Sequence, residues 1–302
     1  KNDFFINCDP KRLVELKEFN KIVDESSKLE ISMSGFTLGN KTIYKNLRSL
    51  KAGQLVLFKH NNYKYIHYYK YFGEIINKSF DEYLVELKDI TLNIFQKTLN
   101  RIGSRQIIIP LSGGYDSRLI ASIFHHLGAR NVKCYSYGTP GNFEAQIAEQ
   151  IAKKLGYDWK FIPLTHRSEK KFYSSTEFKK YLEFSESFSS VPFIQSLSSI
   201  KYLRDLNWIN KDAVFINGLS GDFITGGHAD INKNVKSETK NLETRKEIIL
   251  DKLIEKHFSL WGVLKTKNNL NKIKNNLWDE IINDFGNLAN KEQDHLIFEY
   301  LE

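Results

Sequence analysis

Residues 112–117, Ser-Gly-Gly-Tyr-Asp-Ser, bring two glycines, two hydroxyls and one carboxylate together within six positions. They follow a short apolar run, Gln106–Leu111, and precede a stretch with helical periodicity, Ser117–Leu127. A turn from a buried strand into a helix leaves backbone N–H groups free, and the helix dipole adds partial positive charge there. Anions bind at such turns, so the segment predicts a phosphate-binding loop.

Each residue type in this loop suits a phosphate ligand. Gly113 and Gly114 let the backbone approach phosphate oxygens, and the hydroxyls of Ser112 and Ser117 can donate to the same oxygens. Asp116 cannot donate, and we expect it to hold Mg²⁺, which would neutralise a pyrophosphate. The alternative is a plain Gly-Gly turn in which Ser117 is the helix N-cap.

Other nucleotide and metal motifs are missing from the sequence. It contains no Gly-Lys-Ser/Thr after four spacer residues and no Gly-x-Gly-x-x-Gly fingerprint. Its two cysteines, Cys8 and Cys134, form neither a Cys-x-x-Cys pair nor a Cys/His cluster. We therefore expect no zinc site and no disulfide framework, and a reducing, cytoplasmic location.

The chain is basic, with a net charge of +8 and a pI of about 9.1. A basic surface favours anionic partners, but a Lys- and Asn-rich composition with solvated charges explains the same numbers. We expect no nucleic acid partner. No apolar run approaches the ~20 residues of a membrane span, so we expect no membrane association.

The middle of the chain alternates short apolar runs with amphipathic stretches. The predicted strands are Gln106–Leu111, Asn131–Tyr137, Asp158–Leu164 and Ala213–Asn217; the predicted helices are Phe80–Leu99, Ser117–Leu127 and Phe143–Leu155. This alternation predicts an α/β fold with a doubly wound parallel sheet. Ligands bind beyond the carboxyl ends of the strands in such sheets, which is where the phosphate loop lies.

The flanking regions differ in pattern. Residues 1–75 predict a small β-rich domain with an early helix and a hairpin of Gln54–Phe58 and Tyr65–Tyr69. Residues 76–302 form the second domain, with a helical C-terminal part. Within it, the polar stretch Asp230–Arg245 predicts a mobile lid. His295–Glu302 still has a helical pattern without a stop signal, so we expect further sequence beyond it.

The loop sequence Leu-Ser-Gly-Gly-Tyr-Asp-Ser resembles the PP-loop of the ATP pyrophosphatases, and most of all the synthetase domain of asparagine synthetases. Three further segments are similar to that family. They are the helix from Phe143, the motif Asn217–Asp222 followed by Gly226-Gly227-His228, and Thr42–Tyr69, which resembles the tail of a glutaminase domain. The resemblance implies an adenine-nucleotide α-hydrolase-like sheet in residues 76–302 and a truncated glutaminase remnant in residues 1–75.

The resemblance also implies an activity and a site. Enzymes of this family cut ATP between the α and β phosphates, release pyrophosphate and adenylate a carboxylate, which then passes to ammonia or an amine. Asp116 and Asp222 would be catalytic Mg²⁺ ligands, and the loop residues with Gly218 would bind ATP. Leu111, Tyr137 and Gly138 would line the adenosine pocket. For Leu111 and the strand of Tyr137, core packing is the alternative; for Asp222, it is a turn between glycines.

The sequence departs from the family pattern at several positions. Leu219 and Phe223 replace two glutamates of the second motif. Cys8, the one candidate for the glutaminase nucleophile, is better interpreted as a packed free cysteine. We therefore expect ammonia from outside the chain, for example from a separate glutaminase. Two alternatives stay open: an RNA-modifying PP-loop enzyme, which the pI favours, and a nucleotide-binding protein without catalysis, which Leu219 and Phe223 favour.

Overall fold

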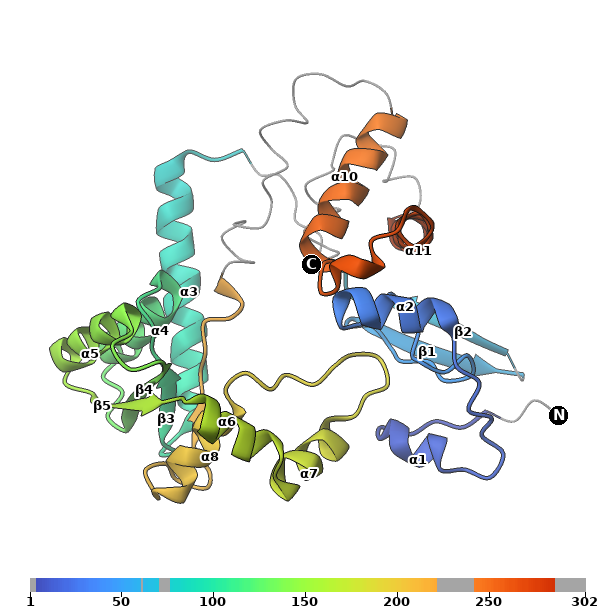
Figure 1. Cartoon of the computed structure of the whole chain (residues 1–302). Helices are drawn as coiled ribbons and strands as arrows, with labels where there is room; N and C mark the ends of the chain where they lie inside the picture. Colours follow the sequence, from blue (N-terminus) through green and yellow to red (C-terminus); the bar gives the residue numbers. More distant parts are fainter. Residues whose placement is uncertain (1–3, 61, 71–76, 222–241, 286–302) are drawn as a thin grey trace. The chain divides into compact units, whose positions relative to one another are not determined.

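The computed structural model describes residues 4–60, 62–70, 77–221 and 242–285 (Figure 1). The chain forms two compact units. The sheet unit comprises Ile75–Lys180 and Ile194–Gly227. The helix–hairpin unit comprises Lys1–Glu74, Tyr181–Phe193 and His228–Glu302.

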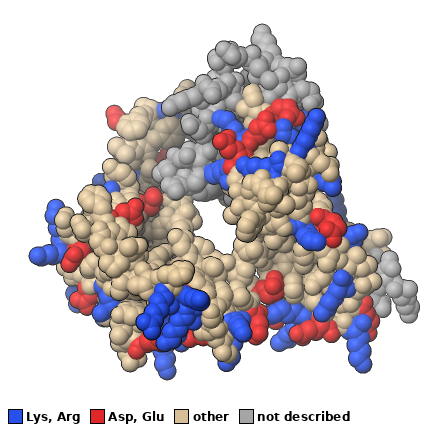
Figure 2. All heavy atoms as spheres, in the orientation of Figure 1, with Lys and Arg blue, Asp and Glu red and all other residues tan. Residues whose placement is uncertain are grey.

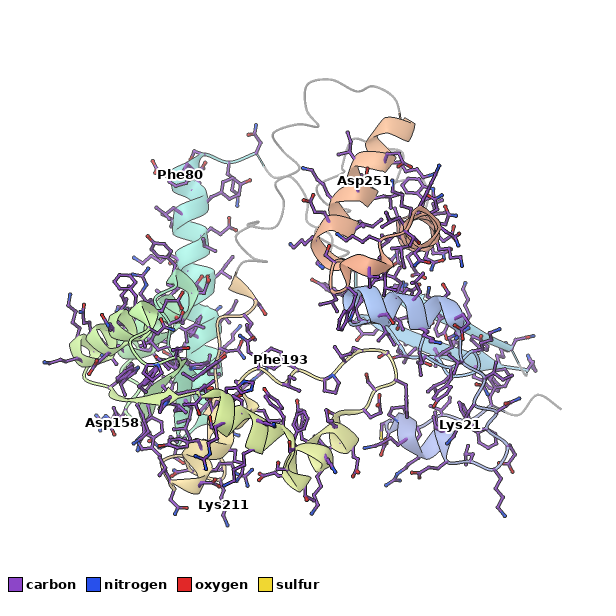
Figure 3. All side chains as sticks on the ribbon, in the orientation of Figure 1. Lys21, Phe80, Asp158, Phe193, Lys211 and Asp251 are labelled. Atoms are coloured by element: carbon purple, nitrogen blue, oxygen red, sulfur yellow. The ribbon has the colours of Figure 1, made fainter. Side chains whose placement is uncertain are left out.

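The sheet unit is built on four parallel strands in the order β5-β4-β3-β6. Their bounds are β3 Ile107–Pro110, β4 Val132–Gly138, β5 Asp158–Pro163 and β6 Val214–Phe215. Asp158, labelled in Figure 3, opens β5. The predicted α/β fold with a parallel sheet is confirmed, although β6 is shorter than expected.

Helices flank these strands, and those that follow β3 form the crossovers that parallel pairing requires. They are α3 Phe80–Ile102, α4 Tyr115–His126, α5 Phe143–Leu155, α6 His166–Tyr173, α7 Thr176–Ser185 and α8 Leu197–Asp205. Local signals set their ends: a capping box of Ser79 and Glu82 begins α3. The Asn142 side chain caps α5, and Gly156 ends it in the left-handed conformation with φ 68°.

The sheet buries a different apolar cluster on each face. Alternate residues of β3 point to opposite faces, so Ile107 and Ile109 join one cluster and Ile108 joins the other. The first cluster is completed by side chains of α3, α4 and α5, including Phe124. The second includes Leu203 of α8. Helices therefore cover both faces, and the carboxyl edge of the sheet stays available for a ligand.

The helix–hairpin unit combines both ends of the chain. Its elements are α1 Pro10–Val14, α2 Glu25–Ser34, β1 Gln54–Lys59, β2 Asn62–His67, α10 Leu242–His257, η2 Gly262–Leu264 and α11 Lys267–Phe285. The antiparallel pairing of β1 with β2 confirms the predicted hairpin, although β2 begins three residues earlier than expected, at Asn62. Its core joins Met33 of α2 to Leu250 and Leu253 of α10 and Leu277 of α11. Helix α2, which Asp24 caps and Gly35 ends, was not predicted.

Two predicted features lie outside the described residues, wholly or for the most part. They are the lid Asp230–Arg245, of which only the backbone from Leu242 is described, and the terminal helix His295–Glu302. Within the described ranges, every helix is too short or too polar to span a bilayer. Lys and Arg side chains are interspersed with Asp and Glu over the face shown in Figure 2.

Candidate nucleotide site

The loop between β3 and α4 leaves the start of the helix without a side-chain cap. Gly114 is the N-cap residue, with φ −73° and ψ 159°, and no side chain accepts a hydrogen bond from the first turn. Helix α4 therefore begins at Tyr115, two residues earlier than expected. The alternative in which Ser117 caps the helix is wrong, because Ser117 is already the third helical residue. The uncapped first turn is a position at which backbone N–H groups bind anions.

The two serines of the loop are hydrogen-bonded to each other. The backbone N–H of Ser112 donates to the hydroxyl of Ser117 at 3.0 Å, and the two hydroxyl oxygens are 2.9 Å apart. The Ser112 hydroxyl also accepts from the Gly114 N–H at 3.1 Å. Ser117 is buried and Ser112 is half-buried. These bonds fix the shape of the loop, while donation to phosphate by the serines stays a prediction.

Gly113 brings the loop against the first turn of α5. A Cβ at this position would lie 3.4 Å from Ile147 Cδ1 and 3.5 Å from Glu144 Cα. A Cβ on Gly114 would lie 3.3 Å from the Ser112 hydroxyl oxygen. A Cβ on Gly114 would therefore be tight against Ser112, whereas one on Gly113 would make ordinary van der Waals contact with α5.

The second motif folds directly onto Asp116. After β6, the Asn217 side chain accepts from the Leu219 N–H at 3.2 Å, and the Gly221 N–H donates to the Gly218 carbonyl at 3.0 Å. A Cβ on Gly218 would lie 2.9 Å from Asp116 Cβ, and one on Gly221 would lie 2.8 Å from the same atom. The Cβ on Gly221 would lie even closer to the Asp116 carboxylate oxygen Oδ1. Only glycines fit against Asp116 at these two positions.

Asp222 lies outside the described residues, but its neighbour Gly221 does not. Gly221, the residue before it in the sequence, contacts Asp116. Asp116 itself is half-buried. Two segments more than a hundred positions apart in the sequence thus meet at the carboxyl edge of the sheet.

The residues predicted for the adenosine pocket do not share one face of the sheet. Leu111 is 2% exposed and belongs to the core on the α4 face, with its N–H bonded to the Tyr135 carbonyl at 2.8 Å. Tyr137 is half-buried on the opposite face, where it stacks on Tyr135 with ring centroids 6.2 Å apart. Gly138 ends β4 with φ 142°. The side chains of Leu111 and Tyr137 therefore lie on different faces of the sheet.

Arg118 is a residue of this site that the sequence analysis missed. Its Nε donates to the Gly114 carbonyl at 3.1 Å, and its guanidinium carbon lies 4.3 Å from the centre of the Tyr115 ring. Tyr115 is 83% exposed. The sequence held one signal for it. An arginine at the fourth position of a helix places a cation near the positive end of the helix dipole, which is unfavourable without an anion.

Two residues that depart from the family pattern are described. Leu219, within the second motif, is 64% exposed, whereas Phe223 lies outside the described residues. Cys8 is exposed, so the interpretation of Cys8 as a packed cysteine is wrong. The preceding residues Phe4, Phe5 and Ile6 are exposed as well.

A family model described as asparagine synthase matches residues 102–296, which include the phosphate loop and the second motif. The chain belongs to the asparagine synthase family. This finding confirms the resemblance drawn from the two motifs. The family uses ATP, and its PP-loop corresponds to the loop between β3 and α4.

Two solved structures are similar to the chain at low identity and low TM-score. An NH3-dependent NAD synthetase from Campylobacter jejuni is 13% identical, with a TM-score of 0.32 over 66% of this chain and 95% of that chain. A protein from Methanocaldococcus jannaschii, titled a predicted subunit of tRNA methyltransferase, is 16% identical, with a TM-score of 0.23 over 57% and 74%. No curated protein matches the chain. Likenesses of this size say nothing about the substrate.

Proposed function

We propose that this member of the asparagine synthase family is an ATP-dependent amide-forming ligase that adenylates a carboxylate. The observation that carries the proposal is the contact of Gly218 and Gly221 with Asp116, which joins the phosphate loop to the second family motif. Family membership supports the use of ATP. The uncapped start of α4 supports binding of its phosphates.

The reaction has two steps. A carboxylate oxygen of the substrate attacks the α-phosphorus of ATP, the bond to the β-phosphate oxygen breaks, and pyrophosphate leaves. Ammonia or an amine then attacks the acyl carbon, loses a proton, and AMP leaves with the electron pair of the broken acyl–oxygen bond. The first turn of α4 would hold phosphate oxygens through its N–H groups, and the Ser112–Ser117 pair would keep the loop in shape for this contact.

The residues at which the second motif meets the phosphate loop fit a magnesium ion. Mg²⁺ prefers oxygen ligands and is bound by one or two carboxylates together with substrate phosphates and waters. Asp116 supplies one carboxylate, and Asp222 follows the glycine that contacts it. Within the described ranges, no group of three or more His, Cys, Asp or Glu could hold a metal by itself. When bound, the ion would neutralise the charge of the leaving pyrophosphate.

Leu219 favours a second candidate, a nucleotide-binding protein without catalysis. It stands where the family has a glutamate, and its exposed apolar side chain can neither take up nor release a proton. In the ligase, the acid–base duty would therefore belong to the substrate amine, to solvent or to another residue.

The two candidates differ in ATP–pyrophosphate exchange measured against a panel of carboxylates. The ligase predicts label in ATP only with Mg²⁺ and one class of carboxylate, and AMP rather than ADP as product once an amine is added. Tight ATP binding without exchange for any carboxylate, in folded protein, would favour the second candidate and overturn the ligase.

A further inference from the structure

The side chain of Arg118 is held at the N-terminal end of α4 by two contacts. Side chains on a helix lean towards its N-terminus, and Arg118 follows this direction back to the N-cap residue. There its Nε donates to the Gly114 carbonyl at 3.1 Å. The ring of Tyr115 lies 4.3 Å from the guanidinium, within the range of a cation–π contact.

This placement is electrostatically unfavourable for a protein without a ligand. The N-terminal end of a helix carries partial positive charge, which favours carboxylates and disfavours cations. Asp116 is the acidic residue of the first turn. Some cations of the sheet unit have a carboxylate partner, as Lys201 has in Asp205 at 2.8 Å. Within the described ranges, Arg118 has no carboxylate partner.

The unused part of the guanidinium matches a phosphate. Arginine presents five N–H donors in a planar fork, and the bond to Gly114 uses Nε. The two terminal nitrogens keep four donors, which suit bidentate contact with phosphate oxygens. Arg118 and the uncapped N–H groups of α4 belong to the same helix end.

We propose that Arg118 is a catalytic residue that binds the leaving pyrophosphate of ATP, and that Tyr115 is the residue that positions it. This inference rests on the proposed function and names a group for its first step. As the bond between the α-phosphorus and the bridging oxygen breaks, negative charge moves to the β-phosphate. Arg118 meets that charge with N–H donors and keeps its proton. The exposed Tyr115 ring fixes the guanidinium and has no part in the chemistry.

Calorimetric titration of the full chain with Mg²⁺–pyrophosphate and, separately, with AMP tests the proposal. Arg118→Gln should weaken pyrophosphate binding by about tenfold to a hundredfold, the usual range for a charged hydrogen-bonded contact. AMP binding should stay within about twofold. Arg118→Lys should restore part of the affinity, because it keeps the charge and loses the fork. Tyr115→Leu should cost about threefold and Tyr115→Phe almost nothing. Arg130→Gln, an exposed arginine beyond the other end of α4, is the matched control.

The outcomes separate this proposal from the proposed function. Equal pyrophosphate affinity in wild type and Arg118→Gln, or equal losses for pyrophosphate and AMP, would show that Arg118 only ties down the Gly114 carbonyl. Wild-type protein that binds no pyrophosphate would also overturn it. A wild type that binds pyrophosphate through Arg118 but exchanges no label with any carboxylate would support Arg118 and reject the ligase. Circular dichroism on each variant confirms the fold.

Discussion

Two charged clusters, one in each unit of the molecule, differ in whether their cation has a carboxylate partner. In the helix–hairpin unit, Lys51 bonds Glu280 at 2.7 Å and Asp284 at 2.8 Å, and the side chain of Asp284 is 5% exposed. In the sheet unit, Asp116 is packed against Gly218 and Gly221, and Arg118 contacts a carbonyl and a ring. The first cluster neutralises its own charges, whereas Arg118 in the second has no carboxylate partner in the part of the chain that the structure describes.

This difference separates a structural cluster from a binding site. Burial lowers the pKa of Lys51, but hydrogen bonds to Asp284 and Glu280 raise the pKa by more, so its net pKa is raised. Glu30 is similar, since Lys41, the Asn276 side chain at 2.7 Å and the Leu38 N–H at 2.9 Å all donate to it. In such clusters the charged groups already have protein partners, so no ligand is required. In the phosphate loop, donors that lack a protein acceptor among the described residues face water, and an anion can take the place of that water.

The largest expected effect is the loss of turnover in Asp116→Asn. The amide keeps the size of the side chain, so the contacts with Gly218 and Gly221 persist, but the negative charge that would hold Mg²⁺ is gone. ATP–pyrophosphate exchange at saturating Mg²⁺ should fall by at least about a hundredfold. A melting temperature close to that of wild type would show an intact fold.

Asp116 has a simpler alternative role that the same variant excludes. If the carboxylate only favoured the start of α4, asparagine would serve nearly as well, at a cost of a few tenths of a kcal/mol. Exchange at the wild-type rate in Asp116→Asn would therefore remove Asp116 from the proposed site and leave the two glycines as packing features.

The second effect is steric and concerns Gly221. Its backbone has an ordinary φ, so alanine is not strained there, and the added methyl group acts only by meeting Asp116. Gly221→Ala should push the second motif off the loop and lower exchange by about tenfold to a hundredfold, because small displacements of catalytic groups are costly. Gly262→Ala is the matched control: that glycine also has an ordinary φ, and its Cβ would meet nothing within 4 Å. Equal rates of ATP–pyrophosphate exchange in Gly221→Ala and Gly262→Ala would contradict a functional contact between Gly221 and Asp116.

Much of the sheet unit could be predicted because its signals are local. Helix α5 has the predicted bounds, Phe143–Leu155, since Asn142 and Gly156 mark its ends in the sequence. The apolar run of β3 and the glycines after it placed the phosphate loop correctly between a strand and a helix. The start of α4 was missed by two residues, because a glycine N-cap leaves no side-chain signal.

The remaining features depend on contacts between distant residues. No local pattern shows that α2 packs with α10 and α11, more than two hundred positions away. The fit of Gly221 against Asp116 and the stacking of Arg118 on Tyr115 are likewise three-dimensional. Leu111 had two interpretations from the sequence, core packing and adenosine binding. Its side chain lies in the core, and its contact with adenosine stays a prediction.

A third, smaller effect should appear in stability rather than catalysis. Lys51→Met leaves the carboxylates of Glu280 and Asp284 side by side with less positive charge. His67, 3.5 Å from Asp284, and Lys70, which bonds the Asp284 carbonyl, remain. We expect a loss of about 2 kcal/mol, below the 3–5 kcal/mol for a fully buried pair, measured by urea unfolding at pH 7. Lys28→Met is the control, because its pair with Glu25 is exposed. Equal stabilities of the two variants would contradict this view of the cluster.

The raised pKa of Lys51 gives this effect a pH dependence with a definite sign. A lysine whose pKa is higher in the folded state stabilises the fold fully below its unfolded pKa of about 10.4, and the contribution is lost as pH rises through the folded pKa. The difference in unfolding free energy between wild type and Lys51→Met should therefore be constant from pH 7 to about pH 9.5 and shrink above about pH 10.4. A difference that grows in that range would contradict the assignment.

The smallest effect contrasts the two cysteines and should leave activity unchanged. Cys8 is exposed, and its thiol donates to the Asn7 side-chain oxygen at 3.9 Å. The Asn7 amide accepts this hydrogen bond but is not a base that could remove the proton of the thiol. Burial raises the pKa of Cys134 to about 12, so its thiol stays protonated in the folded protein far above the ordinary value of about 8.5. Because the thiolate is the reactive form, a disulfide reagent at pH 8 should label one thiol quickly and the second only after unfolding. Cys8→Ala should abolish the fast phase, keep ATP–pyrophosphate exchange, and match wild type in showing no glutamine hydrolysis. Glutaminase activity in the wild-type chain that disappears in Cys8→Ala would instead make Cys8 a nucleophile and place the ammonia source within this chain.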